Sequence, residues 1–178
     1  MTLTDHQLDL YARHIVLPQV GGAGQQKLLA AHVIVIGAGG IGCPALTYLA
    51  AAGVGKLTIV DDDDISLSNL QRQTLYTPEM IGEPKVDAAA RAIRALNPEV
   101  EVVAKRARIT ADTVAGLIVD ADVVLDGSDN FACRLLVADE AYRKRIPLVS
   151  AAIAQFHGQI GTFRGWEDGA PCYRCFIG

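Results

Sequence analysis

The sequence lacks the features that would assign it to a membrane or to nucleic acid. No apolar run approaches the roughly 20 residues that span a bilayer, and residues 1–9 lack the pattern of a signal peptide. The net charge of −4 and the isoelectric point near 5.5 offer no basic footprint for a phosphate backbone. We therefore expect no nucleic-acid partner, no membrane association and a location in the cytoplasm.

Cysteine is also scarce, with four residues at Cys43, Cys133, Cys172 and Cys175. Their number and uneven spacing do not form a disulfide framework, and a reducing compartment keeps such residues as thiols. Only the last two are spaced as a pair, and a C-x-x-C pair is ambiguous between zinc and redox chemistry. The preceding Pro171 and the absence of a thioredoxin-like helix favour zinc. For the other two cysteines we expect packing as small apolar side chains.

The chain is long and apolar enough for one buried core, with 178 residues of which 51% are apolar, so we expect a single domain over residues 1–178. Short apolar segments alternate with helical patterns, which is typical of parallel strands joined by crossover helices. Strands are predicted at 32–36, 56–60, 100–104, 123–126 and 148–151, and an antiparallel one within 159–166. Helices are predicted at 5–16, 42–52, 85–96, 111–119 and 131–143, with a glycine-rich turn at 21–24.

These elements predict a Rossmann-like α/β fold. Its sheet is mostly parallel with helices on both faces, and the chain adds an N-terminal helical extension and an antiparallel edge toward the C-terminus.

A glycine-rich loop follows the first predicted strand directly. The apolar segment 32–36 runs into a G-x-G-x-x-G pattern formed by Gly37, Gly39 and Gly42. The first glycine makes the tight turn, the second lets phosphate approach the backbone, and the third allows close helix packing. Asp61 ends the next apolar segment, at roughly the 20-residue spacing at which a carboxylate accepts from ribose hydroxyls. This order predicts a bound nucleotide, and the alternative is a glycine turn without one.

Positive and polar residues beyond Asp61 favour a triphosphate over a dinucleotide. The segment 66–73 reads Ser-Leu-Ser-Asn-Leu-Gln-Arg-Gln, and Lys85 begins the next predicted helix. The cations of Arg72 and Lys85 suit β- and γ-phosphates or a leaving pyrophosphate, and Asn69 adds a neutral donor. As isolated residues these are more often surface groups, so only their place in a long loop after a ribose acid indicates function.

A second acidic group follows the strand predicted at 123–126. Ligands bind at the carboxyl edge of an open parallel sheet, and Asp129 lies just beyond that edge. Its carboxylate suits Mg²⁺ on a triphosphate, because hard cations prefer carboxylate oxygen. The alternative is that Asp129 caps the following helix. For Asp126 we expect a structural role, and for Asp62 and Asp64 solvated loop positions.

Together these motifs resemble the E1-like adenylyltransferases that activate ubiquitin-like sulfur carriers, the family of MoeB, ThiF and the nucleotide domain of ubiquitin-activating enzymes. The resemblance spans nearly the whole chain, from residues 11–15 through 37–42, 68–73, Lys85 and 129–130 to 172–175. It implies binding of ATP·Mg²⁺ and of a carrier's Gly-Gly tail, whose carboxylate attacks the α-phosphate to give an acyl adenylate and pyrophosphate. An already ionised carboxylate needs no general base, so catalysis would consist of positioning and charge neutralisation.

The resemblance also implies roles for individual residues. Phosphate, ribose and magnesium contacts are expected from Gly40, Asp61, Asn69, Arg72, Lys85 and Asp129. The whole nucleotide site is expected to comprise Gly37, Gly39, Gly40, Gly42, Asp61, Ser68, Asn69, Leu70, Gln71, Arg72, Lys85, Asp129 and Asn130. Arg13, which alone reads as a solvated helix residue, is implied to reach the partner's ATP across a two-fold axis, and this implies a homodimer.

For Cys172 and Cys175 the resemblance implies half of a structural Cys₄ zinc site. Proteins of this family have a second C-x-x-C downstream, so we expect the C-terminal part of the domain to be missing from this chain.

The leading interpretation is adenylation of a MoaD-type carrier in molybdenum cofactor biosynthesis. A ThiS-type carrier of thiamine biosynthesis is an alternative, since it would use the same ATP site. An NAD-linked oxidoreductase is supported only by the glycine loop and Asp61, and it gives no role to Arg72, Lys85 or Asp129. A non-enzymatic ATP-binding module is the remaining alternative.

Overall fold

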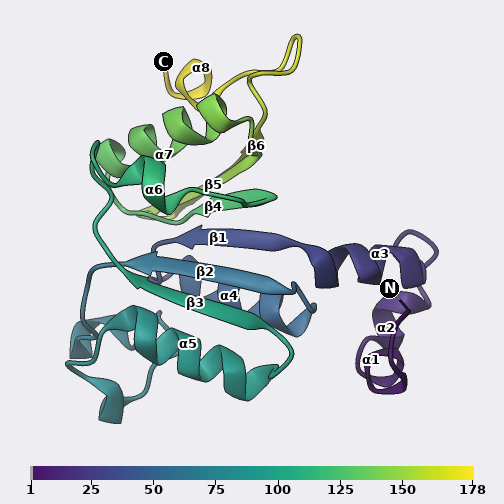
Figure 1. The fold of residues 1–178 in the computed structure, drawn as a ribbon. Coiled ribbons are helices and arrows are strands. Elements are labelled where there is room, and N and C mark those ends of the chain that lie inside the picture. Colours follow the sequence, from purple (N-terminus) through teal and green to yellow (C-terminus); the bar gives the residue numbers. More distant parts are fainter. Residues whose placement is uncertain (1) are drawn as a thin grey trace.

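A six-stranded sheet forms the centre of the protein in a computed structural model that describes residues 2–178 (Figure 1). The strands are β1 (His32–Ile36), β2 (Lys56–Asp61), β3 (Glu101–Arg106), β4 (Val123–Asp126), β5 (Leu148–Ala154) and β6 (His157–Phe163). Their order in the sheet is β3-β2-β1-β4-β5-β6. The first five run parallel and β6 runs antiparallel to β5. The predicted Rossmann-like class with an antiparallel edge is therefore confirmed.

Helices cover both faces of the sheet (Figure 1). They are α1 (Asp5–Leu10), α2 (Ala12–Ile15), α3 (Gly21–Ala30), α4 (Gly42–Ala51), α5 (Lys85–Leu96), α6 (Val114–Leu117), α7 (Phe131–Lys144) and α8 (Tyr173–Ile177), with 3₁₀ turns η1 (Leu67–Asn69) and η2 (Pro78–Met80). Among the described residues, no helix is long and apolar enough to cross a membrane.

Strand β1 shows how one apolar segment serves two cores. Val33 and Val35 belong to a cluster with buried residues of α4 and α5, whereas Ile34 and Ile36 belong to a cluster with buried residues of α6 and α7. Successive side chains of a strand point to opposite faces, so a strand covered by helices on both sides is apolar throughout. This explains why the run His-Val-Ile-Val-Ile carries no alternation.

Two N-terminal predictions were wrong in detail. The helix predicted at 5–16 is divided into α1 and α2 at Tyr11, whose ring is buried and whose hydroxyl accepts from Asn97 Nδ2 at 2.9 Å. The glycine-rich turn predicted at 21–24 is instead the start of α3. Glycine in a helix costs about 1 kcal/mol relative to alanine. Tertiary contacts of this helix offset that cost, including buried Gln25, which donates to the carbonyl oxygen of Ala52 at 2.9 Å.

The remaining elements follow the prediction, some with the predicted ends and others with shifted ones. The helix at 85–96 and the strands at 32–36 and 123–126 have their predicted bounds. The helix predicted at 111–119 is much shorter, because Thr110 and Thr113 form a turn of mutual side-chain and backbone hydrogen bonds before α6. Helix α8 was not predicted.

The strand order reverses between β1 and β4. The chain builds outward from β1 to β3 on one side and from β4 to β6 on the other, so the connections after β1 and β4 diverge. Such a switch point leaves a crevice at the carboxyl ends of the two strands, where ligands of doubly wound folds bind.

Candidate active site

A cleft of about 770 Å³ opens at this switch point. Its volume is within the range of small-molecule sites, roughly 300–1,000 Å³. The sequence-predicted residues that line it are Gly37, Gly39, Gly40, Asp61, Asn69, Arg72, Lys85, Asp129 and Asn130. The fold thus brings together residues from five separate parts of the chain.

The glycine loop needs glycine at its two ends. Gly37 has φ of +87°, and a Cβ there would lie 3.1 Å from the carbonyl oxygen of Gly127 on the neighbouring β4 connection. A Cβ on Gly42 would lie 1.9 Å from the carbonyl oxygen of Gly37. Gly42 therefore closes the turn onto α4 rather than facing the cleft, which is the packing role expected of the third glycine.

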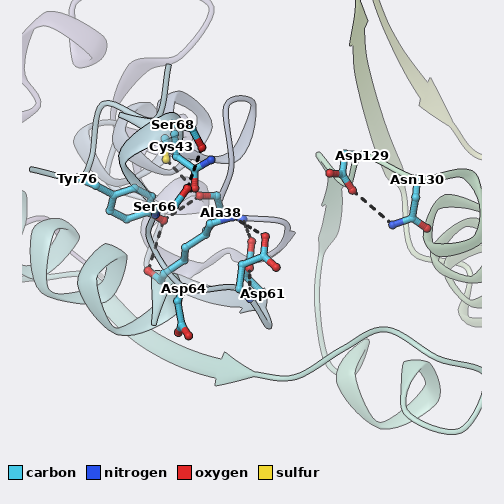
Figure 2. Close-up of polar contacts among 12 residues, drawn as sticks. Ala38, Cys43, Asp61, Asp64, Ser66, Ser68, Tyr76, Asp129 and Asn130 are labelled. Atoms are coloured by element: carbon cyan, nitrogen blue, oxygen red, sulfur yellow. Dashed lines mark hydrogen bonds and ion pairs between the residues drawn. The ribbon is translucent and has the colours of Figure 1, made fainter. Parts of the chain in front are cut away.

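Asp61 is held in a fixed orientation at the end of β2. Its two carboxylate oxygens accept from the backbone N–H groups of Ala38, at 2.7 Å, and Asp63, at 2.8 Å (Figure 2). Burial raises the pKa of this carboxyl above its ordinary value, against the effect of these two hydrogen bonds. The carboxylate lies beside the glycine loop, where the dinucleotide-type fingerprint has its ribose acid.

The sequence-predicted cations of the cleft are Arg72 and Lys85, and Arg108 and Arg134 also line it. Lys85 is 5% exposed, and its Nζ lies 2.7 Å from Oδ2 of Asp63. Arg72 donates through Nη1 to the carbonyl oxygen of Ser68 at 3.2 Å. Its side chain passes over Gly40, where a Cβ would approach Arg72 Cδ to 3.3 Å. One acid of the run after Asp61 is therefore the partner of Lys85, which the sequence did not indicate.

The other two acids of this run are exposed. Asp62 lines the cleft, and Asp64 pairs with Arg106 at 2.9 Å on the protein surface. The expectation of solvated positions holds for both, although Asp62 also faces the cleft.

The opposite wall carries Asp129 and Asn130 on the connection between β4 and α7 (Figure 2). Asn130 is the N-cap of α7, because its Oδ1 accepts from the N–H of Cys133 at 2.9 Å. The alternative that Asp129 caps this helix is therefore wrong. The Asp129 side chain is exposed on the cleft wall, 3.5 Å from Nδ2 of Asn130. Its carboxylate is free to meet a cation.

Three further predicted residues support the loop around η1 without lining the cleft. Ser68 accepts from Arg72 and from Nε2 of Gln71, the latter at 3.4 Å, and Leu70 packs against the core. Asn69 lines the cleft while its Oδ1 also accepts from the N–H of Ser66, at 3.4 Å.

Arg13 does not reach the cleft of its own chain. It is exposed on α2, and α1–α3 lie beside the amino end of β1 in Figure 1, whereas the cleft lies at the carboxyl ends of the strands. Within one chain Arg13 therefore has no access to the site.

Sequence reasoning missed several cleft residues, of which Gln73 is the most informative. Its side chain is 3% exposed and lines the cleft, and among the described residues its Oε1 is a buried oxygen with no hydrogen-bond partner. A buried polar atom left unpaired is costly, so a polar ligand fits this place. Its position at the end of the polar run 66–73 was a signal. Arg134 in α7 also lines the cleft, and no feature of the sequence indicated that it would.

The cleft suits a nucleoside triphosphate with a hard cation. A glycine loop with little side-chain bulk, two cations and an unpaired amide stand on one wall, and a free carboxylate stands on the other. Phosphoryl oxygens accept from the N–H groups of the loop and from the two cations, whereas the unpaired Oε1 of Gln73 accepts from a donor such as a ligand hydroxyl. Mg²⁺ is bound by carboxylate oxygen together with substrate phosphates.

The cysteines divide as predicted into two isolated residues and one pair. Cys43 is fully buried and donates to the carbonyl oxygen of Ala38 at 3.3 Å, while Cys133 is half-buried at the cleft wall. The sulfurs of Cys172 and Cys175 lie 3.2 Å apart, and the backbone N–H of Cys175 lowers the pKa of the Cys172 thiol. Two adjacent thiols fit half of a tetrahedral zinc site, which needs two more ligands.

The sheet order, the glycine loop and the polar cleft define a Rossmann-like domain of the E1-like type. The ThiF family matches residues 11–178, and the chain belongs to this family. This confirms the resemblance that the motifs indicate.

The relatives are named as an activating enzyme or as adenylyltransferases. The chain is 47% identical over 177 residues to the SAMP-activating enzyme E1 of Haloferax volcanii, covering 99% of this chain and 64% of the relative. It is 47% identical over 180 residues to the sulfur carrier protein adenylyltransferase of Thermus thermophilus, covering 99% and 66%. It is 42% identical over 173 residues to the molybdopterin-synthase adenylyltransferase of Escherichia coli, covering 97% and 69%. The chain thus spans about two thirds of these relatives.

Solved structures share the fold. E. coli tRNA N6-threonylcarbamoyladenosine dehydratase TcdA in complex with ATP superposes with a TM-score of 0.79 at 30% identity, covering 84% of this chain and 61% of that chain. E. coli MccB with MccA-N7isoASN superposes with a TM-score of 0.85 at 26% identity, covering 93% and 50%.

Proposed function

We propose that this chain is the ATP-binding part of an enzyme that adenylates the C-terminal Gly-Gly carboxylate of a ubiquitin-like sulfur carrier protein in the cytoplasm. The observation that carries the proposal is the meeting of the glycine loop, Asp61, Arg72, Lys85 and Asp129 in one cleft. The names of the relatives support adenylyl transfer. An NAD-linked oxidoreductase has weaker support, since a dinucleotide gives no role to the two cations or to Asp129.

The reaction needs binding and charge neutralisation rather than proton transfer. An oxygen of the ionised carrier carboxylate forms a bond to the α-phosphorus, the bond from that phosphorus to the bridging oxygen of the β-phosphate breaks, and pyrophosphate leaves with the electron pair. Negative charge grows on the leaving pyrophosphate, where Arg72 and Lys85 stabilise it. For this, Lys85 shares or exchanges its present partner Asp63.

The remaining residues orient the nucleotide. Asp61 accepts from the ribose hydroxyls, the loop from Gly37 to Gly42 receives the phosphates, and Asn69, Gln73 and Asn130 supply polar groups around them. Asp129 holds the Mg²⁺, which neutralises phosphate charge when bound. Holding the two reactants in line converts a reaction between two molecules into one within a complex.

For the carrier we propose a MoaD-type protein of molybdenum cofactor biosynthesis. The likeness to a molybdopterin-synthase adenylyltransferase supports this choice, and the likeness to a general sulfur carrier protein adenylyltransferase leaves a ThiS-type carrier as the alternative.

The test is ATP–pyrophosphate exchange with Mg²⁺ and purified MoaD-type and ThiS-type carriers, each with its Gly-Gly tail intact or removed. We expect exchange with one carrier, lost when its tail is removed. ATP binding without exchange with either carrier would overturn adenylation and support the ATP-binding module.

We further propose that the protein acts as a homodimer in which Arg13 of each chain serves the partner's cleft. This accounts for an arginine that is exposed and does not line the cleft of its own chain. Mixing Arg13→Ala with Arg72→Ala protein should restore part of the exchange activity, because one site of the mixed dimer then has both arginines. No recovery in verified mixed dimers would refute the sharing.

We propose a structural zinc site that includes Cys172 and Cys175, whose sulfurs are 3.2 Å apart. Because two more ligands are needed, the 178-residue chain should hold less than one zinc per chain by metal analysis. Full zinc content in this chain would refute the Cys₄ assignment.

A further inference from the structure

A buried arginine at the cleft wall holds the loop of residues 127–130. Arg134, in the first part of α7, is 6% exposed although it carries a charge. Its Nη1 donates to the carbonyl oxygen of Ala151 on β5 at 2.9 Å, and its Nη2 donates to the carbonyl oxygen of Ser128 in the loop. The donors of a guanidinium point in fixed, divergent directions, so one side chain ties the loop to β5.

Asp126, at the end of β4, forms hydrogen bonds to the same loop. It is fully buried, and its Oδ1 accepts from both the backbone N–H and the hydroxyl of Ser128, at 3.0 and 2.6 Å. Its Oδ2 lies 3.9 Å from Nη1 of Arg134, and the hydroxyl of Ser150 donates to it at 3.3 Å. The structural role expected for Asp126 is therefore to hold Ser128 in place.

This pair is not explained by stability alone. Desolvating two charges costs about as much as their attraction returns, so buried ion pairs contribute little net folding energy compared with apolar residues. What the pair of Arg134 and Asp126 does is fix the N–H, hydroxyl and carbonyl oxygen of a single loop residue, Ser128.

The loop residue that follows is Asp129. Its neighbours on both sides are anchored, Ser128 by the buried pair and Asn130 by its cap of α7. Asp129 itself makes one weak contact, with Asn130 at 3.5 Å, and is exposed at the cleft wall. The backbone on either side therefore fixes where the Asp129 side chain leaves the loop and which part of the cleft its carboxylate can reach.

We infer that Arg134 is a positioning residue that acts with Asp126, through the backbone of Ser128, to aim the Asp129 carboxylate at the magnesium of the nucleotide. This inference rests on the proposed function, because it assigns Asp129 to the metal. Arg134 lines the cleft, but its Nη1 and Nη2 donate to the carbonyl oxygens of Ala151 and Ser128, so we assign it an action through the loop and not by contact with the reacting atoms.

The test compares Arg134→Lys with wild type, since lysine keeps the charge beside Asp126 but not the divergent donors. Without nucleotide, we expect amide hydrogen exchange in residues 127–130 to be at least about tenfold faster, with β4 and α7 still protected. With Mg²⁺, ATP affinity should fall about tenfold to a hundredfold, as for other groups that orient metal ligands. With EDTA in place of Mg²⁺, ATP affinity should change less than about twofold.

Arg143→Lys is the matched control. Arg143 lies on the same helix and makes two guanidinium hydrogen bonds to Glu140, at 2.8 and 2.5 Å, away from the loop. This variant should leave both loop exchange and ATP affinity as in wild type.

Wild-type loop protection and wild-type Mg²⁺-dependent affinity in Arg134→Lys would overturn the inference, because the arginine would then only neutralise Asp126. If that variant fails to fold, Asp126→Asn/Arg134→Gln removes both charges and should fold. The inference requires that this double variant still shows fast loop exchange, and slow exchange there would overturn it. Absence of ATP binding by wild type would instead refute the proposed function, while the exchange comparison without nucleotide would still be decisive for the loop.

Discussion

The two walls of the cleft differ in how far their charged side chains are already hydrogen-bonded within the protein. On the wall built from β1, β2 and the start of α5, the charged groups Asp61 and Lys85 are already paired, with two backbone N–H groups and with Asp63, although Oε1 of Gln73 has no partner among the described residues. On the wall built from β4 and α7, Asp129 has only a 3.5 Å contact with Asn130. On the first wall a bound ligand competes with existing partners such as Asp63 for the side chain of Lys85. On the second wall a bound ligand or cation supplies a partner that the Asp129 carboxylate lacks in the described part of the chain.

A buried tyrosine holds part of the first wall in place. The connection between β2 and α5 is long, but Ile65 and Tyr76 within it are buried in the core. The hydroxyl of Tyr76 donates to the carbonyl oxygen of Ala38 at 2.8 Å and so ties this connection to the glycine loop (Figure 2). A long surface connection is thereby made part of a rigid wall.

The largest effect should come from breaking the turn of the first wall. In Gly42→Ala the new Cβ lies 1.9 Å from a backbone oxygen, so the turn must open. We expect a loss of unfolding free energy of about 3 kcal/mol, the upper end of the common range, together with loss of ATP binding. Denaturant unfolding and calorimetric titration measure the two effects.

Gly39→Ala is the control for this variant. A Cβ there meets only Nε2 of Gln73 at 3.7 Å, which is ordinary contact. This variant should keep its stability but bind ATP more weakly, because the added methyl occupies the approach of the phosphates. Equal stability losses in both variants would contradict this account of the loop.

On the second wall, Asp129→Ala should reduce Mg²⁺-dependent exchange activity about a hundredfold or more, since charge neutralisation at the reacting phosphate is lost. The residue is exposed, so thermal unfolding should stay near that of wild type. Asp112→Ala, which removes an exposed acid outside the cleft, should leave activity unchanged. Retained activity in Asp129→Ala would remove its metal role.

A smaller effect is expected for Lys85→Met on the first wall. Loss of one phosphate partner should lower the exchange rate about tenfold to a hundredfold. Lys56→Met is a matched control, because Lys56 makes an equally short 2.7 Å ion pair, with Glu101, far from the cleft. If both variants lower the rate alike, the phosphate role of Lys85 is wrong.

The smallest effect concerns the pH dependence of Asp61. Burial raises its pKa in the folded protein, so the proton binds the folded state more tightly than the unfolded state. The resulting stability is present below the ordinary carboxyl pKa and is lost as pH rises through the raised pKa. Acceptance from ribose hydroxyls needs the ionised form, so ATP affinity should fall on acidification already above the ordinary carboxyl pKa. Calorimetric titration across pH should show this step, and Asp61→Asn should lack it.

Much of the first wall could be predicted from sequence because its parts are close together in the chain. The strand, the glycine loop, the helix and Asp61 follow one another, and each is recognised by local residue chemistry. The binding roles of these residues stay predictions. The second wall was predicted only in part. Asp129 was found from its place after a strand, but the buried pair of Asp126 and Arg134 that holds the preceding residue was not predicted.

The sequence by itself determined the alternation of strands and helices, the turn at Gly37 and the acid at the end of β2, because local sterics and hydrophobic pattern decide them. Only the tertiary structure decided that β1 lies between β2 and β4, and hence that Asp61 and Asp129 face one cleft. It also decided that residues 21–24 are helical and that Gln73 and Arg134 are buried. These outcomes depend on contacts between segments far apart in the chain, which no local pattern encodes.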